Sequence, residues 1–163
     1  MVTMDAFIER LNPDMYVVTA FAGGERAGCL VGFASQCSIQ PVRFVVWLSK
    51  ANHTFRVARS ADRLAVHLLR REQTELAALF GGETGDRVDK FARVAWRTGP
   101  DGTVVLRDAP AWFVGAVEQR VDGGDHVGFV LTPLESGGEQ PGTMPAMFRL
   151  SDARGISPGH PVD

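Results

Sequence analysis

The sequence predicts one mainly β domain, built as a closed or split barrel of about seven strands with three or so short helices. Composition is the first reason, since 18 Gly and 9 Pro in 163 residues suit many turns better than a helical bundle. The second is that most apolar stretches are short, β-rich or alternating. The third is that the helical stretches are scattered singly, which does not fit a parallel βαβ stack. A chain of this length is normally one domain, so we expect a single domain over residues 1–163, with a core of about 5–150 and a tail over 151–163.

The strands are expected where β-branched, aromatic or alternating residues are bounded by turn signals. The longest of them should bend near Gly32, because an interior glycine weakens a strand. Asp122-Gly123-Gly124-Asp125 is a hairpin signal between two alternating strands. The expected strands are 15–21, 26–39, 43–49, 64–69, 103–106, 111–121 and 127–134, with a helical turn leading into a strand at 87–96 and a late strand candidate at 147–150.

Three short helices are expected. Residues 3–12 place Phe7, Ile8 and Leu11 on one stripe, with Thr3 as a possible cap and Pro13 just beyond the end. The other two helices are expected at 52–61, with Phe55, Val57 and Ala58 inward, and at 72–80, with Leu76, Leu79 and Phe80 on one face.

Charge and cysteine content exclude several classes of protein. The formal net charge is −2, and Lys and Arg are spread without a basic block, so we expect neither nucleic acid nor a membrane surface as partner. Cys29 and Cys37 are too few for a disulfide framework, and their spacing matches no zinc pattern, so no metal site is expected. No apolar run approaches the ~20 residues that cross a bilayer. The N-terminal residues carry acids and no apolar run, so we expect no secretory signal and a cytoplasmic location.

The common nucleotide and hydrolase motifs are missing from the sequence. There is no GxGxxG, no P-loop, no GxSxG and no HExxH. If the chain binds a nucleotide, it uses another scaffold.

The first candidate site is the segment Leu48 to Thr54, where a strand ends and a helix begins near Asn52. Backbone N–H groups, the positive end of the helix, the side chains of Asn52 and Thr54, and the Lys50 ammonium would converge there and could hold a phosphate. On spacing alone, a simple N-cap with a solvated lysine is the commoner arrangement.

The second candidate is Gly32 to Ser38, which is rich in small and hydroxylic residues. Such residues let a planar ring approach the backbone, and their N–H and hydroxyl groups can bind its polar edge. The alternative is a barrel corner at which small residues merely allow a bend.

Two further features are weaker. His126 follows Gly124 and Asp125 after the hairpin turn, so it could donate a proton or orient a ligand, although a lone His in such a place is more often a turn residue. His53, His67 and His160 have weaker claims, and His67 is expected to be structural. A glycine-rich loop over 81–86, followed by Asp89-Lys90-Phe91, could cover a flat ligand or be only a connection.

Taken in order, these stretches resemble the flavin reductase family with the FMN-binding split barrel. No single motif is specific, and the resemblance rests on their order over about residues 5–135. The matching stretches are Met15 to Thr19, Gly28 to Leu30, Ser35 to Pro41, Lys50 to Thr54, Leu64 to His67, Gln73, Leu76-Ala77, Phe80-Gly81, Asp89 to Phe91 and Gly124 to His126.

The resemblance implies a homodimer that binds each flavin across the subunit seam. It implies that His126 lies near the flavin and seats the nicotinamide. The implied cofactor-binding residues are Leu30, Phe33, Ala34, Ser35, Gln36, Cys37 and Ser38 for the ring and ribityl chain, with Lys50, Asn52, His53 and Thr54 for the phosphate, and Phe91.

The chain departs from the family pattern along the expected flavin wall. Leu30 stands where the family has Thr, and Phe33 replaces a small residue. Val42 follows Pro41 where a double proline is usual, and His67 replaces the commoner Asn. These changes indicate that the cofactor chemistry differs from that of a standard member.

The preferred hypothesis is therefore an NAD(P)H-dependent FMN reductase, in which hydride passes from nicotinamide to bound flavin. FAD and a deazaflavin are the alternative cofactors, and a flavin-dependent oxygenase is a further partner that the resemblance raises. The alternatives in function are a non-catalytic flavin or deazaflavin binding protein, a deazaflavin-dependent reductase, and a plain structural barrel.

Overall fold

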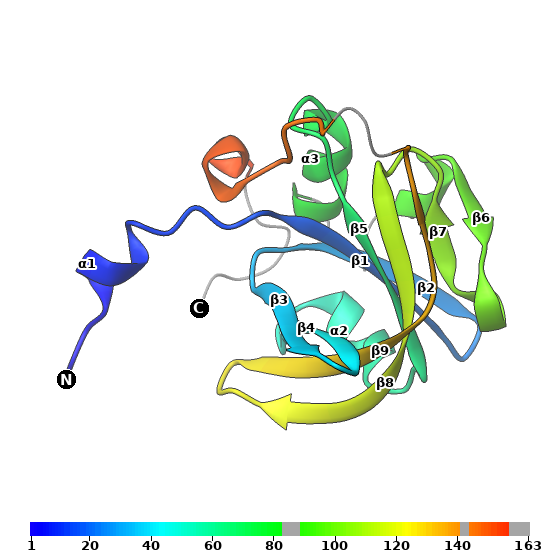
Figure 1. Ribbon diagram of the computed structural model, residues 1–163, viewed down its shortest axis with the longest axis horizontal. Helices are drawn as coiled ribbons and strands as arrows, with labels where there is room; N and C mark the ends of the chain where they lie inside the picture. The colour runs from blue at the N-terminus through cyan, green and yellow to red at the C-terminus, as the bar shows by residue number, and fades with distance from the viewer. Residues whose placement is uncertain (83–88, 141–143, 157–163) are drawn as a thin grey trace.

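A computed structural model describes residues 1–82, 89–140 and 144–156 and shows one curled antiparallel sheet with a small second sheet beside it (Figure 1). The seven strands of the large sheet have the spatial order β2-β1-β5-β8-β9-β4-β3. They are β1 (Tyr16–Ala22), β2 (Glu25–Val31), β3 (Ala34–Ile39), β4 (Val42–Ser49), β5 (Arg63–Leu68), β8 (Ala111–Asp122) and β9 (His126–Gly138). β6 (Trp96–Thr98) pairs with β7 (Val104–Leu106). The predicted mainly β class is confirmed.

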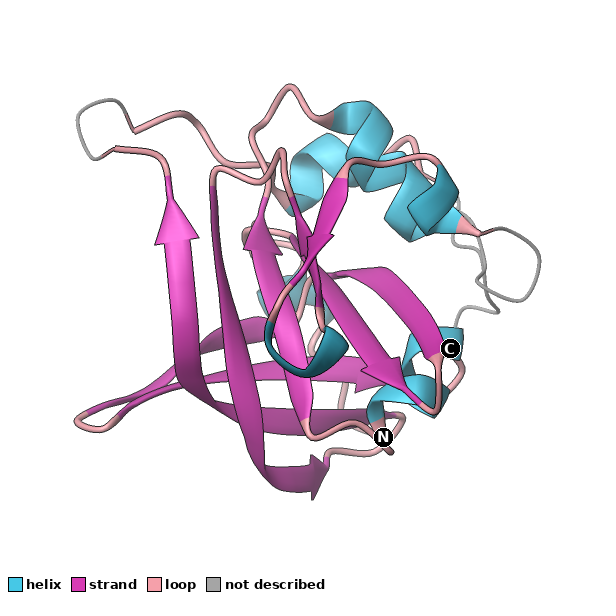
Figure 2. Cartoon of the chain, turned by 90° about the vertical axis from the view of Figure 1, so that its right-hand side faces the viewer, coloured by secondary structure: helices cyan, strands magenta, loops and turns pink. Residues whose placement is uncertain are grey.

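The large sheet curls until β2 and β4 are in contact, although they are far apart in the order of hydrogen-bonded strands. The curled sheet is a split barrel, because no ladder joins these two strands among the described residues. Helix α2 (His53–Ala58) packs against β1, β2 and β4. Figure 2 shows the strands wrapping round the molecule with helical segments at its ends.

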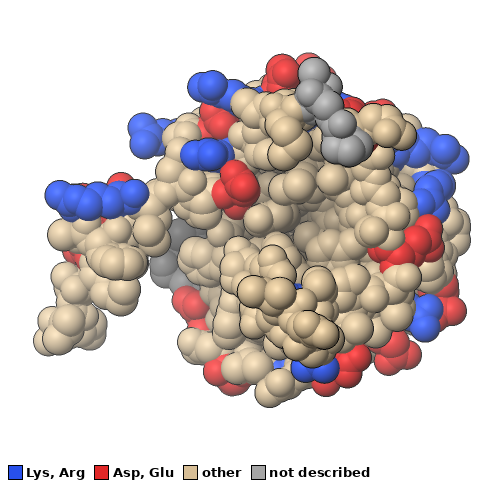
Figure 3. All heavy atoms as spheres, viewed as in Figure 1, with Lys and Arg blue, Asp and Glu red and all other residues tan. Residues whose placement is uncertain are grey.

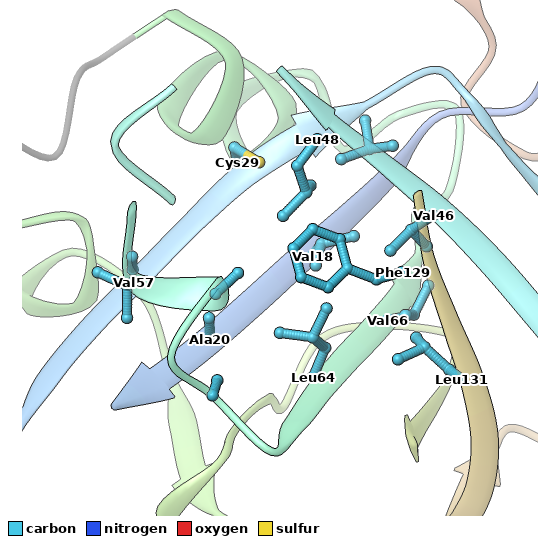
Figure 4. Close-up of a cluster of buried hydrophobic side chains, with 14 residues drawn as sticks. Val18, Ala20, Cys29, Val46, Leu48, Val57, Leu64, Val66, Phe129 and Leu131 are labelled. Atoms are coloured by element: carbon cyan, nitrogen blue, oxygen red, sulfur yellow. The ribbon is translucent and has the colours of Figure 1, made fainter. Parts of the chain in front are cut away.

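The interior of the barrel is apolar and centres on Phe129 of β9, which is fully buried. Val18 of β1, Leu64 of β5 and Leu48 of β4 surround this ring (Figure 4). Phe55 of α2 meets Phe129 edge to face, with the ring centroids 6.3 Å apart. Each large apolar side chain buried here contributes about 1.5–3 kcal/mol to the stability of the barrel.

A second apolar cluster covers the outside of the barrel over β1 and β2. It joins Val17 of β1 to Phe80 of α3 (Thr74–Gly82), Leu106 of β7 and Phe148 near the C-terminus. Phe91 of the 3₁₀ helix η1 (Lys90–Ala92) also packs here. The middle of β1 is therefore covered on both faces, which explains its continuous apolar sequence.

The helices near the predicted positions differ in their ends. Asn52 caps α2 by accepting from the Thr54 N–H at 2.9 Å, as the sequence indicates. Helix α1 (Asp5–Ile8) is much shorter than the predicted 3–12, and its N-cap is Met4 without a side-chain hydrogen bond, so the Thr3 cap is wrong. This single turn stands away from the body (Figure 1), and Phe7, Ile8 and Leu11 are exposed among the described residues.

The prediction of one strand over 26–39 is also wrong. β2 ends at Val31 and β3 begins at Ala34, and the two strands lie at opposite ends of the sheet order. β2 pairs with β1, whereas β3 forms a hairpin with β4. At the bend expected near Gly32, the chain leaves one end of the sheet order and joins the other end across the open seam of the barrel.

Residues 147–150 are not a strand either. Met147 and Arg149 make isolated bridges to Arg70 and Asp14, and Leu150 begins the 3₁₀ helix η3 (Leu150–Ala153). In the expected glycine loop, Gly81 and Gly82 extend α3, while 83–88 lie outside the described residues, as does His160 of the expected tail. Over the described parts of the chain, no helix is long and apolar enough to cross a membrane.

Polar side chains join the two layers at the centre of the fold. The fully buried ring of His67 on β5 lies between two backbone groups, the Val17 carbonyl at 2.9 Å from Nδ1 and the Leu106 N–H at 3.0 Å from Nε2. Nδ1 therefore donates and Nε2 accepts, which requires the neutral ring. Burial lowers the pKa of His67 to about 4. The Thr19 hydroxyl similarly donates to the Val104 carbonyl at 2.7 Å.

The His67 arrangement predicts a loss of stability in mild acid. The unfolded chain takes up a proton near the ordinary pKa of 6.5, whereas the folded protein resists it to about 4. The free energy of unfolding should therefore fall as pH drops from 6.5 to 4, by up to about 3 kcal/mol from this group. The free energy of unfolding, measured with urea at several pH values in that range, should change less with pH for His67→Gln than for the wild type. An equal pH dependence in the two proteins would contradict the assignment of His67 as a buried, neutral ring.

Candidate functional site

A cavity of about 580 Å³ lies where β2, β4, the start of α2 and the β8–β9 turn meet. Its size falls within the range of small-molecule sites, roughly 300–1,000 Å³. One end carries polar side chains and the other is apolar. The two ends come from different parts of the chain.

The polar end is made by the terminal pair of the β4–β9 ladder, Ser49 and His126, and by residues just beyond it. Ser49 and Asn52 line it on one side, and Asp125 and His126 on the other. The Lys50 N–H donates to the Asp125 carbonyl at 2.9 Å, and this bond holds the two loops together. Backbone at strand ends is free of the ladder, so polar side chains can converge there.

Asp125 orients the His126 ring. Its Oδ1 lies 2.7 Å from His126 Nδ1, and the His126 side chain is 26% exposed. A carboxylate at this distance accepts from Nδ1–H, which leaves Nε2 as the nitrogen able to reach a ligand. The Phe33 ring contacts the imidazole at a centroid distance of 4.9 Å.

Two aromatic side chains, Phe33 and Trp47, line the cavity beside the polar end. Phe33 is 60% exposed, and its carbonyl accepts from the Trp47 N–H at 2.9 Å. The Trp47 indole lies flat against the hairpin, since a Cβ placed at Gly123 or Gly128 would come within 2.7 or 2.8 Å of its ring. Only glycine fits under the indole at these two positions.

The apolar end is lined by Met15 before β1, Leu30 of β2, Gly81 of α3 and three residues of the C-terminal turn. Leu30 belongs to the outer apolar cluster. Flat apolar walls with a few polar groups at one end suit an aromatic ligand with a polar edge.

Lys50 lies beside the cavity rather than on its wall. Its Nζ donates to both carboxylate oxygens of Asp122, at 3.0 and 3.1 Å. The Gly124 N–H also donates to Asp122 at 2.9 Å, and these two partners hold the pKa of Asp122 below its usual value. The ion pair is exposed on both sides, so it is weak and its lysine can change partners.

Cys29, which lines the cavity, forms a buried pair with Thr54. Burial raises the pKa of the Cys29 thiol to about 11, although the hydrogen bond with the Thr54 side chain and the charge of Lys90 act against the shift. The thiol therefore stays neutral at physiological pH and is not a nucleophile. The Thr54 side chain is only 1% exposed.

The chain matches the family described as "Flavin reductase like domain" over residues 8–148. This chain belongs to that family.

A "Probable flavin reductase" of Rhizobium meliloti is 31% identical over 127 residues, which cover 74% of this chain and 40% of that protein. The reductase subunit HsaB of a flavin-dependent monooxygenase from Mycobacterium tuberculosis is 30% identical, over 78% of this chain and 70% of the relative. An FMN-binding protein from Thermus thermophilus, solved with bound p-hydroxybenzaldehyde, has a TM-score of 0.79 at 21% identity, covering 86% of this chain and 80% of that one, and shows the same fold. The chain spans about half the length or less of the two Rhizobium meliloti relatives that it matches, at 40% and 54%.

Within this flavin reductase-like domain, the cavity brings together four of the residues proposed from the sequence. They are Leu30, Phe33, Asn52 and His126. Lys50 is adjacent, and Thr54 lies behind the wall. His53 faces the other way, with its Nε2 2.6 Å from a Glu25 carboxylate oxygen.

The remaining proposed residues lie elsewhere in the protomer. Residues 34–38 are on β3, an edge strand whose side chains are mostly exposed. Phe91 is in the outer cluster, with its ring 5.8 Å from that of Phe80. Ser49 lies within the candidate segment 48–54 but was not named as a binding residue, and Trp47 and the C-terminal turn were missed as cavity residues. The pairing of Trp47 with Gly128 across β4 and β9 would have indicated Trp47, but only once the strand register was known.

The contact between Trp47 and Gly128 predicts the effect of Gly128→Ala. The new methyl group would overlap the indole, so we expect a loss of about 1–3 kcal/mol in the free energy of unfolding. In a Trp47→Leu background the same change should cost much less, because the overlap is gone. Gly155→Ala is the matched control, since a Cβ there meets nothing within 4 Å. Equal costs in both backgrounds would show that the indole is not what excludes a side chain.

Proposed function

We propose that this domain is an NAD(P)H-dependent flavin reductase that binds FMN and passes hydride from nicotinamide to the flavin. The observation that carries the proposal is the cavity itself, with Phe33 and Trp47 on its walls and Asn52 and His126 at its polar end, in a chain of the flavin reductase-like family. These residues fit a flat ring that is apolar along one edge and polar along the other.

A bound flavin supplies the hydride-accepting chemistry, and the protein supplies orientation and electrostatics. His126, held by Asp125, seats the second ligand against the first. Phe33 packs on His126 and lines the cavity beside it. Leu30 and Phe33, which replace smaller or polar residues of the family pattern, narrow the space beside the ring.

FMN is the proposed flavin because a terminal phosphate has a candidate partner at the polar end. The Asn52 amide lines the cavity, and Lys50 is able to exchange Asp122 for a phosphate. Ser49 and the backbone of the short loop add further polar groups. FAD and a deazaflavin are the alternatives, since they share the ring.

We further propose that two copies of the chain build each complete site. Residues 34–38 were proposed to contact flavin, yet they are exposed on the edge strand β3 and do not line their own cavity. A flavin held at a seam between two protomers would reach them. Apolar side chains that are exposed in the described part of the protomer support such a seam, among them Phe7 and Ile8 of α1 and Ile39 and Val42 at the β3–β4 turn.

A flavin-dependent oxygenase is the proposed recipient of the reduced flavin. The support is the Mycobacterium tuberculosis relative, named as the reductase subunit of a flavin-dependent monooxygenase.

The proposed function predicts that the purified protein takes up FMN and that anaerobic NADH or NADPH bleaches its absorbance. His126→Ala should keep its affinity for FMN but lose about a hundredfold in turnover, because the second ligand is no longer seated. Stopped-flow absorbance measures both. Absence of flavin binding would refute the proposal, and flavin binding without bleaching by either donor would indicate a non-catalytic carrier.

The ion pair predicts opposite effects of two neighbouring substitutions on FMN affinity. Lys50→Ala should weaken FMN binding by about tenfold, the value of one charge-assisted hydrogen bond. Asp122→Ala should strengthen it, because Lys50 then has no competing carboxylate. Riboflavin, which lacks the phosphate, is the matched ligand and should bind all three proteins equally. Parallel changes for both ligands would show that Lys50 acts on the hairpin and not on a phosphate.

A further inference from the structure

The C-terminal turn of the described chain contributes to the cavity although it lies beyond the region that the family shares. The family match ends at residue 148. Leu150, Ala153 and Ile156 nevertheless line the cavity, from η3 and the residue that follows its last turn. Figure 1 shows this segment, at the red end of the colour bar, close to α3.

Backbone hydrogen bonds on both sides fix the start of the turn. Phe148 is fully buried, donates to the Leu69 carbonyl and accepts from the Met15 N–H, each at 2.9 Å. The Leu150 N–H donates to the Pro13 carbonyl at 2.9 Å. The turn is thereby tied to the segment that leads into β1, which also supplies Met15 to the cavity.

Polar side chains hold the body of the turn. The Asp152 carboxylate accepts from the Arg149 N–H at 3.0 Å and from Arg71 Nε at 3.3 Å. The Ser151 N–H donates to Asn12 Oδ1 at 2.9 Å. These hydrogen bonds fix the turn against the rest of the domain, so its apolar side chains have a defined position on the cavity wall.

The turn continues the wall that Leu30 begins. A Cβ placed at Gly81 would lie 2.9 Å from Leu30 Cδ2 and 3.4 Å from Ile156 Cγ2, so both side chains approach the α3 backbone at the same residue. Ala153 and Ile156 belong to the same outer apolar cluster as Leu30. The bulky Leu30, a departure from the family pattern, therefore lies in the same apolar cluster as the C-terminal turn and on the same cavity wall.

The chemistry of this wall is purely apolar. Met15, Leu30, Gly81, Leu150, Ala153 and Ile156 carry no ionisable group and no side-chain hydrogen-bond donor. The polar and ionisable side chains of the cavity come from β2, from β4 and the loop that follows it, and from the β8–β9 turn and the first residue of β9; they are Cys29, Trp47, Ser49, Asn52, Asp125 and His126. A phosphate or a ribityl chain gains nothing from such a wall, whereas the apolar edge of an aromatic ring gains by burial.

We propose that the C-terminal turn is a specificity-determining wall that contacts the tricyclic ring of a bound flavin and sets the width of the space it enters. This inference rests on the proposed function, because it requires a flavin in the cavity. Leu150 and Ile156 are the contacting residues, and Ala153 limits the width.

The test measures dissociation constants of riboflavin and FMN by fluorescence for the wild type, Leu150→Ala, Ile156→Ala and Ala153→Leu. Each alanine variant should weaken both ligands by about three- to tenfold, because each loses part of a buried apolar contact. The ratio of the two constants should not change, since the two ligands share the ring. Ala153→Leu should weaken both as well, by narrowing the space. Met144→Ala, an exposed apolar residue of the same segment, is the matched control and should bind like the wild type.

Three outcomes would overturn the proposal that the C-terminal turn contacts the flavin ring. Unchanged dissociation constants in both alanine variants would place the ring elsewhere. A changed ratio of FMN to riboflavin would place the phosphate at the turn. Unchanged flavin affinity with a raised KM for NADH would assign the turn to the second ligand. If the wild type binds no flavin, the proposed function fails first, and thermal unfolding of each variant separates lost affinity from lost folding.

Discussion

The fold depends on a single constraint, the burial of β1 on both of its faces. Val18 and Ala20 point into the barrel, while Val17 and Thr19 point out beneath the second layer. A strand buried in this way needs cover on the outside, and α3, β7 and the segment around Phe148 provide it. Burying backbone polar groups between the layers costs little free energy here, because the side chains of His67 and Thr19 form hydrogen bonds with them.

The same cover brings distant parts of the chain to the mouth of the cavity. Gly81 arrives because α3 lies on β2, and the C-terminal turn arrives because Phe148 is anchored between Leu69 and Met15. The polar end has a separate origin, because it lies at the end of the β4–β9 ladder, where Ser49 and His126 form the last pair. Charged side chains of both signs are spread over the margin of the face shown in Figure 3, and its centre is mostly uncharged. The site thus combines an apolar wall, where the two layers of the fold meet, with polar residues at the end of the β4–β9 ladder.

Local patterns were sufficient for most of the fold. β1, β4, β5, β8 and β9 lie close to their predicted positions, because each is a β-rich run bounded by turn residues. The break between β2 and β3 escaped prediction because residues 26–39 are continuous in composition, and only their long-range partners differ. In the site, Asn52 and His126 were found from a cap and a turn, which are local signals. Trp47 and the C-terminal turn could not be found in this way, since their place at the cavity follows from which strands meet.

The indole of Trp47, lying flat on the hairpin, has a consequence for how this sequence can diverge. A side chain at Gly128 would overlap only the Trp47 ring, and one at Gly123 would overlap that ring and also approach the His126 carbonyl at 3.3 Å. Substitution of either glycine is therefore disfavoured while position 47 is tryptophan, and it becomes easier once a smaller residue has replaced the tryptophan. These three positions should vary together among descendants of this chain, with the order of substitutions fixed by the ring.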